Sequence, residues 1–234
     1  MKKSLKIALP ILAVILVAAI GAGLYFAAPL LAMAPVETGE VPAPNFSIFA
    51  LRSGNGNLYL VDTGEGWLMI DAGANVKSVE AGLGELGIHS SEVKWIFLTH
   101  THGDHVAALP LFPHAKIYMN VNESKFALPA GTKIDWPLTG GEKIPCGDVV
   151  VECIAAPGHT PGSMLYRVHK VDWERSYLFT GDALQKRKAQ APSVHPFTQD
   201  KALAEQTISN LPTDVWMIMT SHYGYFPAPP SLST

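Results

Sequence analysis

Charged residues are scarce in this sequence. Of its 234 residues, only 16% are Asp, Glu, Lys or Arg, against about 25% in ordinary soluble domains. The deficit is local, because the 30 residues from Ile7 to Val36 carry no charge at all. No other apolar stretch approaches the roughly 20 residues needed to cross a bilayer, which excludes a protein with several membrane-spanning helices. A hydrophobic content of 48% also excludes a disordered chain.

Basic residues are also few, with 17 Lys and Arg against 20 Asp and Glu. Residues 1–36 hold three lysines and no acidic residue, so the remaining 198 residues hold 14 basic and 20 acidic side chains. Their net charge of -6 would repel nucleic-acid phosphates, and we therefore expect no nucleic-acid partner. A remainder of this length suits one domain with a sizeable core.

Cysteine is limited to Cys146 and Cys153. They lie seven residues apart in apolar sequence, and neither has a metal-ligand spacing. If Gly147 and Asp148 form the turn of a hairpin, the two sulfurs do not lie opposite each other. We therefore predict two buried free thiols rather than the disulfide that an exported domain would permit.

The uncharged segment at the start of the chain follows three lysines, which is the pattern of an export signal. Its length is sufficient for one membrane-spanning helix, while Ala32-Met33-Ala34 offers a small-residue cleavage site. An uncleaved anchor and a cleaved signal both remain open, and Pro35 directly after that site favours the anchor. In either case the lysines stay inside the cell. We expect a domain in the cell envelope, periplasmic or extracellular, with the membrane as a partner through residues 1–36.

The rest of the chain divides into a linker and a domain. Residues 37–45 are rich in proline and indicate a linker, which leaves residues 46–234 as the domain. Hydrophobic patterning there predicts strands alternating with helices. Strands are expected at 46–51, 57–62, 67–70, 94–99, 116–120, 149–155, 163–169, 176–180 and 215–220, and helices at 75–86, 104–109 and 198–210. Each half of the domain is expected to begin with strands and to continue with a strand–helix–strand unit. This repeated order predicts an α/β sandwich of two similar halves.

Three histidines and an aspartate fall within six residues at the end of the strand expected at 94–99. Side chains two apart on extended backbone point the same way, so His100 and His102 can reach one cation. Gly103 permits a sharp turn, after which Asp104 and His105 face another direction and suit a second cation. Imidazole with carboxylate is the donor set of zinc, and also of iron and manganese. We expect two divalent metal ions, with zinc favoured over iron or manganese.

The motif His100-x-His102-x-Asp104-His105 resembles the signature of the metallo-β-lactamase-fold hydrolases. Four further segments resemble motifs of that family in the same order along the chain. They are Leu68–Gly73, Ala156–Ser163, Leu178–Ala183 and Ser221–Gly224. The resemblance covers about residues 46–225 and is to the family's broad, glyoxalase II-like branch. It implies a four-layer αββα sandwich and a zinc-dependent metallo-hydrolase.

The same resemblance implies a pair of metal ions that share one carboxylate. Carried over residue by residue, the first ion takes His100, His102 and His159, the second takes Asp104, His105 and His222, and Asp182 bridges the two. Asp104 is also the carboxylate expected to orient the attacking water or to pass a proton. Asp71 either holds a ligand histidine through a hydrogen bond or merely ends its strand, and both interpretations remain open.

The four other histidines do not lie in a spacing typical of metal ligands or catalytic residues. His195 precedes Pro196 in a loop that could border the site, and we interpret it, with the three that remain, as a structural or surface residue.

Paired cations roughly 3.5–4 Å apart share a water molecule and lower its pKa. We therefore expect an exported binuclear hydrolase whose metal-bridging hydroxide attacks the carbonyl of a small ester, thioester, lactone or amide. The alternative is a metallo-β-lactamase that hydrolyses β-lactam antibiotics, which export to the periplasm would suit. The resemblance favours the first, because β-lactamases of this fold generally do not use the aspartate corresponding to Asp182 as a bridge. A metal-binding sensor without turnover is a third, less favoured hypothesis.

Overall fold

A computed structural model describes residue 28 and residues 31–44, 46–171, 175–186 and 191–228. Most of the uncharged segment expected to be an anchor or an export signal lies outside the described residues. Within them, no helix is both long and apolar enough to span a membrane. The chain separates into two compact units, residues 1–33 and 34–234, and the second unit holds all the strands described below.

Seven strands form the first sheet, in the order β1-β2-β3-β4-β5-β6-β7. Their bounds are β1 Gly39–Glu40, β2 Ile48–Ser53, β3 Gly56–Asp62, β4 Trp67–Ile70, β5 Val93–Phe97, β6 Lys116–Asn120 and β7 Trp136–Leu138. The strands from β1 to β4 are antiparallel, whereas β4, β5, β6 and β7 run parallel. The carboxyl ends of β4, β5 and β6 therefore meet at one edge of the sheet, where ligand sites of α/β proteins gather.

Six strands form the second sheet, in the order β13-β12-β11-β10-β9-β8. Their bounds are β8 Lys143–Cys146, β9 Val149–Ala155, β10 Met164–Lys170, β11 Ser176–Gly181, β12 Val215–Thr220 and β13 Tyr225–Pro227. Only β11 and β12 are parallel, and their carboxyl ends lie side by side. The first sheet is thus built from the first half of the domain and the second sheet from the second half.

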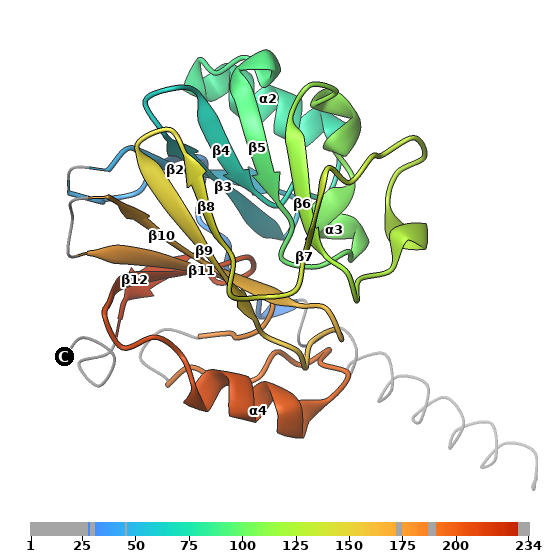
Figure 1. The fold of residues 1–234 in the computed structure, drawn as a ribbon, viewed down its shortest axis with the longest axis vertical. Coiled ribbons are helices and arrows are strands. Elements are labelled where there is room, and N and C mark those ends of the chain that lie inside the picture. Colours follow the sequence, from blue (N-terminus) through green and yellow to red (C-terminus); the bar gives the residue numbers. More distant parts are fainter. Residues whose placement is uncertain (1–27, 29–30, 45, 172–174, 187–190, 229–234) are drawn as a thin grey trace, which may run out of the picture. The chain divides into compact units, whose positions relative to one another are not determined.

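The helices cover the outer faces of the two sheets. They are α2 Val76–Leu86, α3 Gly103–Val106 and α4 Lys201–Ser209, with short 3-10 helices η1 Ser90–Glu92, η2 Leu109–Leu111 and η3 Lys125–Ala127. Figure 1 shows α2 and α3 on one side of the molecule and α4 on the other, with both sheets between them. This four-layer order confirms the predicted αββα sandwich.

Apolar side chains fill each of the three spaces between these layers. The cluster between the sheets contains large aromatic residues that are fully buried, such as Phe97, Tyr166 and Phe179. A second cluster lies between the first sheet and α2, and a third packs against α4. Burial of each such aromatic side chain contributes about 2–3 kcal/mol, so the sandwich is held chiefly by its central layer.

Two tyrosine hydroxyls cross from one sheet to the other. Tyr59 on β3 donates to the carbonyl of Thr220 at the end of β12, over 2.9 Å. Tyr166 on β10 donates to the carbonyl of Leu98, directly after β5, over 2.6 Å. Both bonds end at carboxyl ends of parallel strands, so they fix the distance between the two sheet edges on which the site is built.

Helix α2 begins and ends as its sequence predicts. Asn75 caps the amino end by accepting the Ser78 N–H, and Gly87 ends the helix in the left-handed conformation at φ 70°, as is usual for both positions. The glycine inside the helix at position 82 faces Leu51 on β2. A Cβ atom there would lie 2.6 Å from Leu51 Cγ, so Gly82 permits the helix to approach the sheet.

The nine predicted strands all exist, with bounds within two residues of those expected. Four strands were not expected, namely β1, β7, β8 and β13. Part of the segment expected to be a linker, residues 37–45, packs on the domain: β1 pairs with β2, and Val41 is 1% exposed. The cysteine prediction is confirmed: Cys146 and Cys153 are buried and free, and burial raises the pKa of both thiols to about 12.

Candidate metal centre

The predicted ligand residues come together at the carboxyl ends of strands from both sheets. His100 and His102 follow β5 of the first sheet, and Asp104 and His105 belong to α3 directly after them. Three residues come from the second sheet: His159 after β9, Asp182 after β11 and His222 after β12. Residues far apart in the sequence therefore meet at a single edge of the sandwich.

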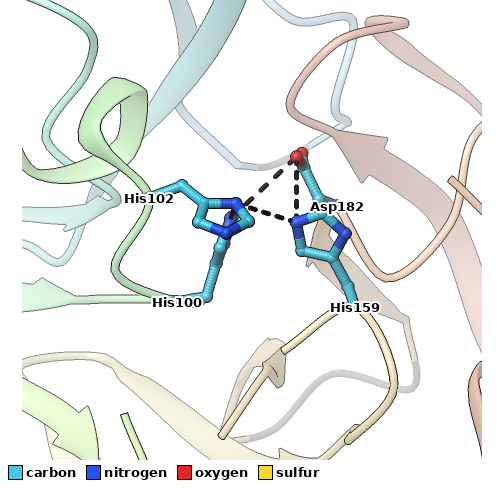
Figure 2. Close-up of side chains that lie close together, drawn as sticks. All are labelled: His100, His102, His159 and Asp182. Carbon is cyan, nitrogen blue, oxygen red and sulfur yellow. Dashed lines mark hydrogen bonds and ion pairs between the residues drawn. The ribbon is translucent and has the colours of Figure 1, made fainter. Parts of the chain in front are cut away.

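Three histidines form a first group around a common point, with Asp182 beside them (Figure 2). His102 Nδ1 lies 3.0 Å from His100 Nε2 and 3.0 Å from His159 Nε2. The nitrogens of a tetrahedral zinc site lie about 3.3 Å apart when the metal–nitrogen bonds are about 2.0–2.1 Å long. The three ring nitrogens therefore stand close to the separations that one cation requires.

A second group consists of Asp104, His105 and His222. The two oxygens of Asp104 lie 3.4 Å from His222 Nε2 and 3.8 Å from His105 Nε2. The side chain of Asp104 is 44% exposed, whereas both histidines are buried. This group can also surround one cation, and it leaves a carboxylate in contact with water.

Asp182 stands between the two groups. Its Oδ2 lies 3.5 Å from His159 Nε2 and 3.9 Å from His100 Nε2, in the first group. Its Oδ1 lies 3.3 Å from His222 Nε2 and 3.6 Å from His105 Nε2, in the second. One carboxylate thus presents a different oxygen to each group, which is the arrangement of a bridging ligand.

Buried polar atoms without partners indicate that these residues fit a divalent metal site. Among the described residues, His105 Nε2 and Asp182 Oδ1 are buried and make no hydrogen bond. Such atoms cost stability when nothing satisfies them. Imidazole nitrogens and carboxylate oxygens facing one another in this way match the donor set of divalent zinc, iron or manganese.

The electrostatics of the centre separate its histidines into two classes. Burial lowers the pKa of His100, and it lowers the pKa of His159 to about 3. Burial acts in the same direction on His105, but the carboxylates of Asp71 and Asp182 outweigh it and hold this pKa well above its usual value. Burial opposes ionisation of Asp182 too, yet His222 and His105 keep its pKa well below the usual range.

Asp71 contacts His105 at Nδ1, the ring nitrogen that does not face the centre. Its Oδ2 lies 2.8 Å from His105 Nδ1, and its Oδ1 accepts the Thr99 N–H over 2.8 Å. Asp71 has φ 62°, a conformation that non-glycine residues adopt only when surrounding contacts hold them. Of the two interpretations left open by the sequence, the structure shows the hydrogen bond. Holding Nδ1 turns Nε2 toward the centre.

Glu123 is a buried residue beside the centre that the sequence analysis missed. It is 7% exposed, and one oxygen accepts the backbone N–H and the hydroxyl of Thr101 over 2.8 and 2.7 Å. Its other oxygen accepts the Thr160 hydroxyl and, over 3.0 Å, the Gly162 N–H. Glu123 therefore ties the loop of His100 and His102 to the loop of His159. Its position just after β6, at the edge where ligands gather, was the available signal.

His195 also lies in the centre, although the sequence analysis assigned it only a structural or surface position. It is 2% exposed, and its ring centre lies 5.2 Å from that of His159 and 5.6 Å from that of His222. Its Nε2 is 4.0 Å from Asp182 Oδ2. Burial lowers the pKa of His195. No spacing in the sequence connects its loop to the ligand motifs.

Comparison with known proteins agrees with this arrangement. A model of the metallo-beta-lactamase superfamily matches residues 51–215, which is more than half of the chain. An uncharacterised Bacillus subtilis protein, YobT, is 34% identical over 158 residues, covering 56% of this chain and 63% of its own. An atrochrysone carboxyl ACP thioesterase of Aspergillus fumigatus is 28% identical over 127 residues, 54% of this chain and 28% of its own. The chain thus spans less than two thirds of the length of either relative.

Solved structures give the same architecture. BJP-1, a subclass B3 metallo-beta-lactamase of Bradyrhizobium japonicum, superposes with a TM-score of 0.65 over 86% of this chain and 89% of its own. The two sequences are 18% identical, so this likeness concerns the fold alone.

Proposed function

The chain belongs to the metallo-β-lactamase superfamily, and from that premise we propose that it is a binuclear metal-dependent hydrolase of small molecules with an ester, thioester, lactone or amide carbonyl. The position of Asp182 carries the proposal, because its two oxygens face two separate groups of predicted ligands. A carboxylate at that position favours a metal pair over a single ion.

The residues that would hold the pair are those predicted from the sequence. His100, His102 and His159 would hold one ion, Asp104, His105 and His222 the other, and Asp182 both. When bound, two zinc ions activate water as a nucleophile near neutral pH and polarise the carbonyl under attack. The surrounding imidazoles are held in place by partners outside the centre, such as Asn55, whose carbonyl oxygen lies 2.8 Å from His222 Nδ1.

Asp104 is suited to move the proton of the reaction. It is the most exposed of the seven predicted ligands, so one of its oxygens can meet water and substrate. As the oxygen of water bonds to the carbonyl carbon, Asp104 accepts the proton that the water loses. When the bond to the leaving group breaks with its electron pair, Asp104 returns that proton to the departing oxygen, sulfur or nitrogen.

The substrate class rests on two kinds of support. The bridging position of Asp182 departs from the usual β-lactamase ligand set. The Aspergillus fumigatus relative is named as a thioesterase, which supports an acyl thioester among the candidate substrates.

Metal analysis of the purified chain, together with the Asp182→Asn variant, tests the proposal. We expect two metal ions per wild-type chain and at most one in Asp182→Asn, with kcat/KM at least about 10³-fold lower. Asp148→Asn changes an exposed aspartate and serves as the matched control. One ion or none in the wild type would overturn the binuclear centre.

A substrate panel then decides the reaction. It comprises 4-nitrophenyl butyrate, S-acetyl-N-acetylcysteamine, N-hexanoyl homoserine lactone and nitrocefin. Turnover of the ester, thioester or lactone supports the proposal. Turnover of nitrocefin alone would instead favour the β-lactamase.

We also propose that the domain works outside the cytoplasm. The support is the three-lysine start followed by the uncharged run from Ile7 to Val36. Fractionation of cells that express the full chain tests this: the domain should be accessible to protease added to intact spheroplasts. Protection until the cells are lysed would contradict it.

A further inference from the structure

His195 presents an unpartnered ring nitrogen to the metal centre. Its Nε2 is buried and makes no hydrogen bond to the residues that the structure describes. The carboxylate oxygen Asp182 Oδ2 lies 4.0 Å from this nitrogen, too far for a hydrogen bond. A polar atom this well buried is costly unless it meets a partner during function.

The backbone decides which nitrogen of His195 carries the proton. The N–H of Phe197 donates to His195 Nδ1 over 3.4 Å, so Nδ1 carries the lone pair. In a neutral imidazole the proton then sits on Nε2. Asp182, His195 and His222 lie close enough together to hold a cation. A metal ligand would need the lone pair on Nε2, however, so the tautomer set by Phe197 favours His195 as a donor over an eighth ligand.

The loop that carries His195 is fixed to the ligand loops on both sides. Before it, Gln185 and Ser193 exchange two backbone hydrogen bonds of 2.8 and 2.9 Å, three residues after Asp182. After it, Asp200 donates its N–H to the carbonyl of Gly158 over 2.9 Å, next to His159. The Nε2–H is therefore oriented in advance, as a donor must be to stabilise a charge that develops only in the transition state.

We propose that His195 donates its Nε2–H to the carbonyl oxygen of the substrate as that oxygen becomes an oxyanion. The inference rests on the proposed hydrolase function. When water adds to the carbonyl carbon, the electron pair of the C=O double bond moves to this oxygen, and the hydrogen bond from His195 strengthens. The proton stays on His195, and the pair returns when the leaving group departs. A buried donor of this kind contributes about 10²–10³-fold to kcat.

Two variants separate this role from its alternatives. His195→Phe keeps an aromatic ring but removes the donor, whereas the amide of His195→Gln places an N–H near the position of Nε2. We expect kcat of His195→Phe to fall about 10²-fold with KM within about threefold, because the bond strengthens only in the transition state. His195→Gln should regain at least a tenth of the wild-type kcat. Both variants should keep two metal ions per chain.

A binding measurement provides a readout that does not depend on turnover. Phenylphosphonate presents a tetrahedral anion, and its binding can be followed by the visible spectrum of the Co(II)-loaded chain. We expect His195→Phe to bind it about tenfold more weakly than the wild type, and His195→Gln to fall between the two.

The outcomes keep this inference apart from the proposed function. If the wild-type chain fails to bind two ions, the proposed function is contradicted without any measurement on the His195 variants. Loss of a metal ion in His195→Phe would make His195 a ligand and overturn the inference. Unchanged kcat and unchanged phosphonate affinity in His195→Phe would mean that His195 serves only in packing. That result would also overturn the inference.

Discussion

Asp71 Oδ2 lies 2.8 Å from His105 Nδ1 and is the partner that holds this imidazole from behind. The same carboxylate accepts the backbone N–H of Thr99, so His105 is linked through it to the residues that follow β5. The orientation of one predicted ligand thus depends on a residue that touches neither predicted ion.

Replacing Asp71 by asparagine should weaken one metal position selectively. Loss of such a partner typically costs 10–100-fold in metal affinity, so we expect that loss for the second ion while the first stays bound. Competition titration with a chromophoric chelator measures both affinities. Glu80→Gln, an exposed carboxylate on α2, should leave both unchanged. Equal weakening of the two ions in Asp71→Asn would contradict a role specific to His105.

Loading the metal-free chain should release protons. Burial lowers the pKa of His105, but Asp71 and Asp182 outweigh it and raise this pKa well above its usual value. We therefore expect His105 to carry a proton near neutral pH when no metal is bound. A cation must displace that proton, and the affinity for the second ion should rise with pH until the raised pKa is passed. Phenol red in weak buffer at pH 7 reports the release, which should decrease in Asp71→Asn. Loading without any release would contradict the protonated state.

Glu123→Gln should destabilise the domain and loosen the first group of ligands. An amide places donor hydrogens against the N–H and hydroxyl donors that this buried carboxylate accepts. We expect a loss of about 2–3 kcal/mol in the free energy of unfolding, measured in urea.

Glu142→Gln is the matched control for that variant. Glu142 accepts an equivalent set of bonds from Thr139 and Gly140, but it lies at a partly exposed turn, where water can replace them. Its variant should lose about 1 kcal/mol or less. An equal effect of the two substitutions would argue against the clamp that Glu123 forms between the ligand loops.

Alanine at the two glycines inside α2 should have opposite effects. A Cβ at position 82 would lie 2.6 Å from Leu51 Cγ, whereas a Cβ at position 84 meets nothing within 4 Å. Gly84→Ala should therefore stabilise the domain by about 0.5–1 kcal/mol through helix propensity alone. Gly82→Ala should destabilise it despite the same gain in propensity, by about 1–3 kcal/mol of overpacking. Thermal unfolding of the two variants provides the comparison.

The strands that the sequence failed to predict share one position in the fold. β1 and β7 are the two edges of the first sheet, and β8 and β13 are the two edges of the second. Three of them contain a proline, such as Pro137 in β7 and Pro145 in β8. Edge strands tolerate proline and are half-exposed, so neither periodicity nor composition distinguishes them from loops. The inner strands are apolar on one or both faces and were predicted closely.

The residues of the candidate site also differ in how far the sequence alone could predict them. The proximity of predicted ligands within one motif, such as His100 and His102, could be inferred from the sequence because short spacing on extended backbone fixes where side chains point. Glu123 and His195 act through contacts between loops that are distant in sequence, and no local pattern encodes such contacts. The clustering of the predicted ligands could therefore be inferred from the sequence, whereas the contacts that Glu123 and His195 make with their loops required the fold.

The seven predicted ligands are shared between both sheets of the sandwich. An ion held by His102 of the first sheet and His159 of the second would act as a non-covalent cross-link between the two halves of the chain. Ions that bind only the folded domain would add about 4 kcal/mol to its stability when free metal stands a thousandfold above the dissociation constant. The concentration of free metal around the protein would then determine its resistance to proteolysis as well as its catalytic rate.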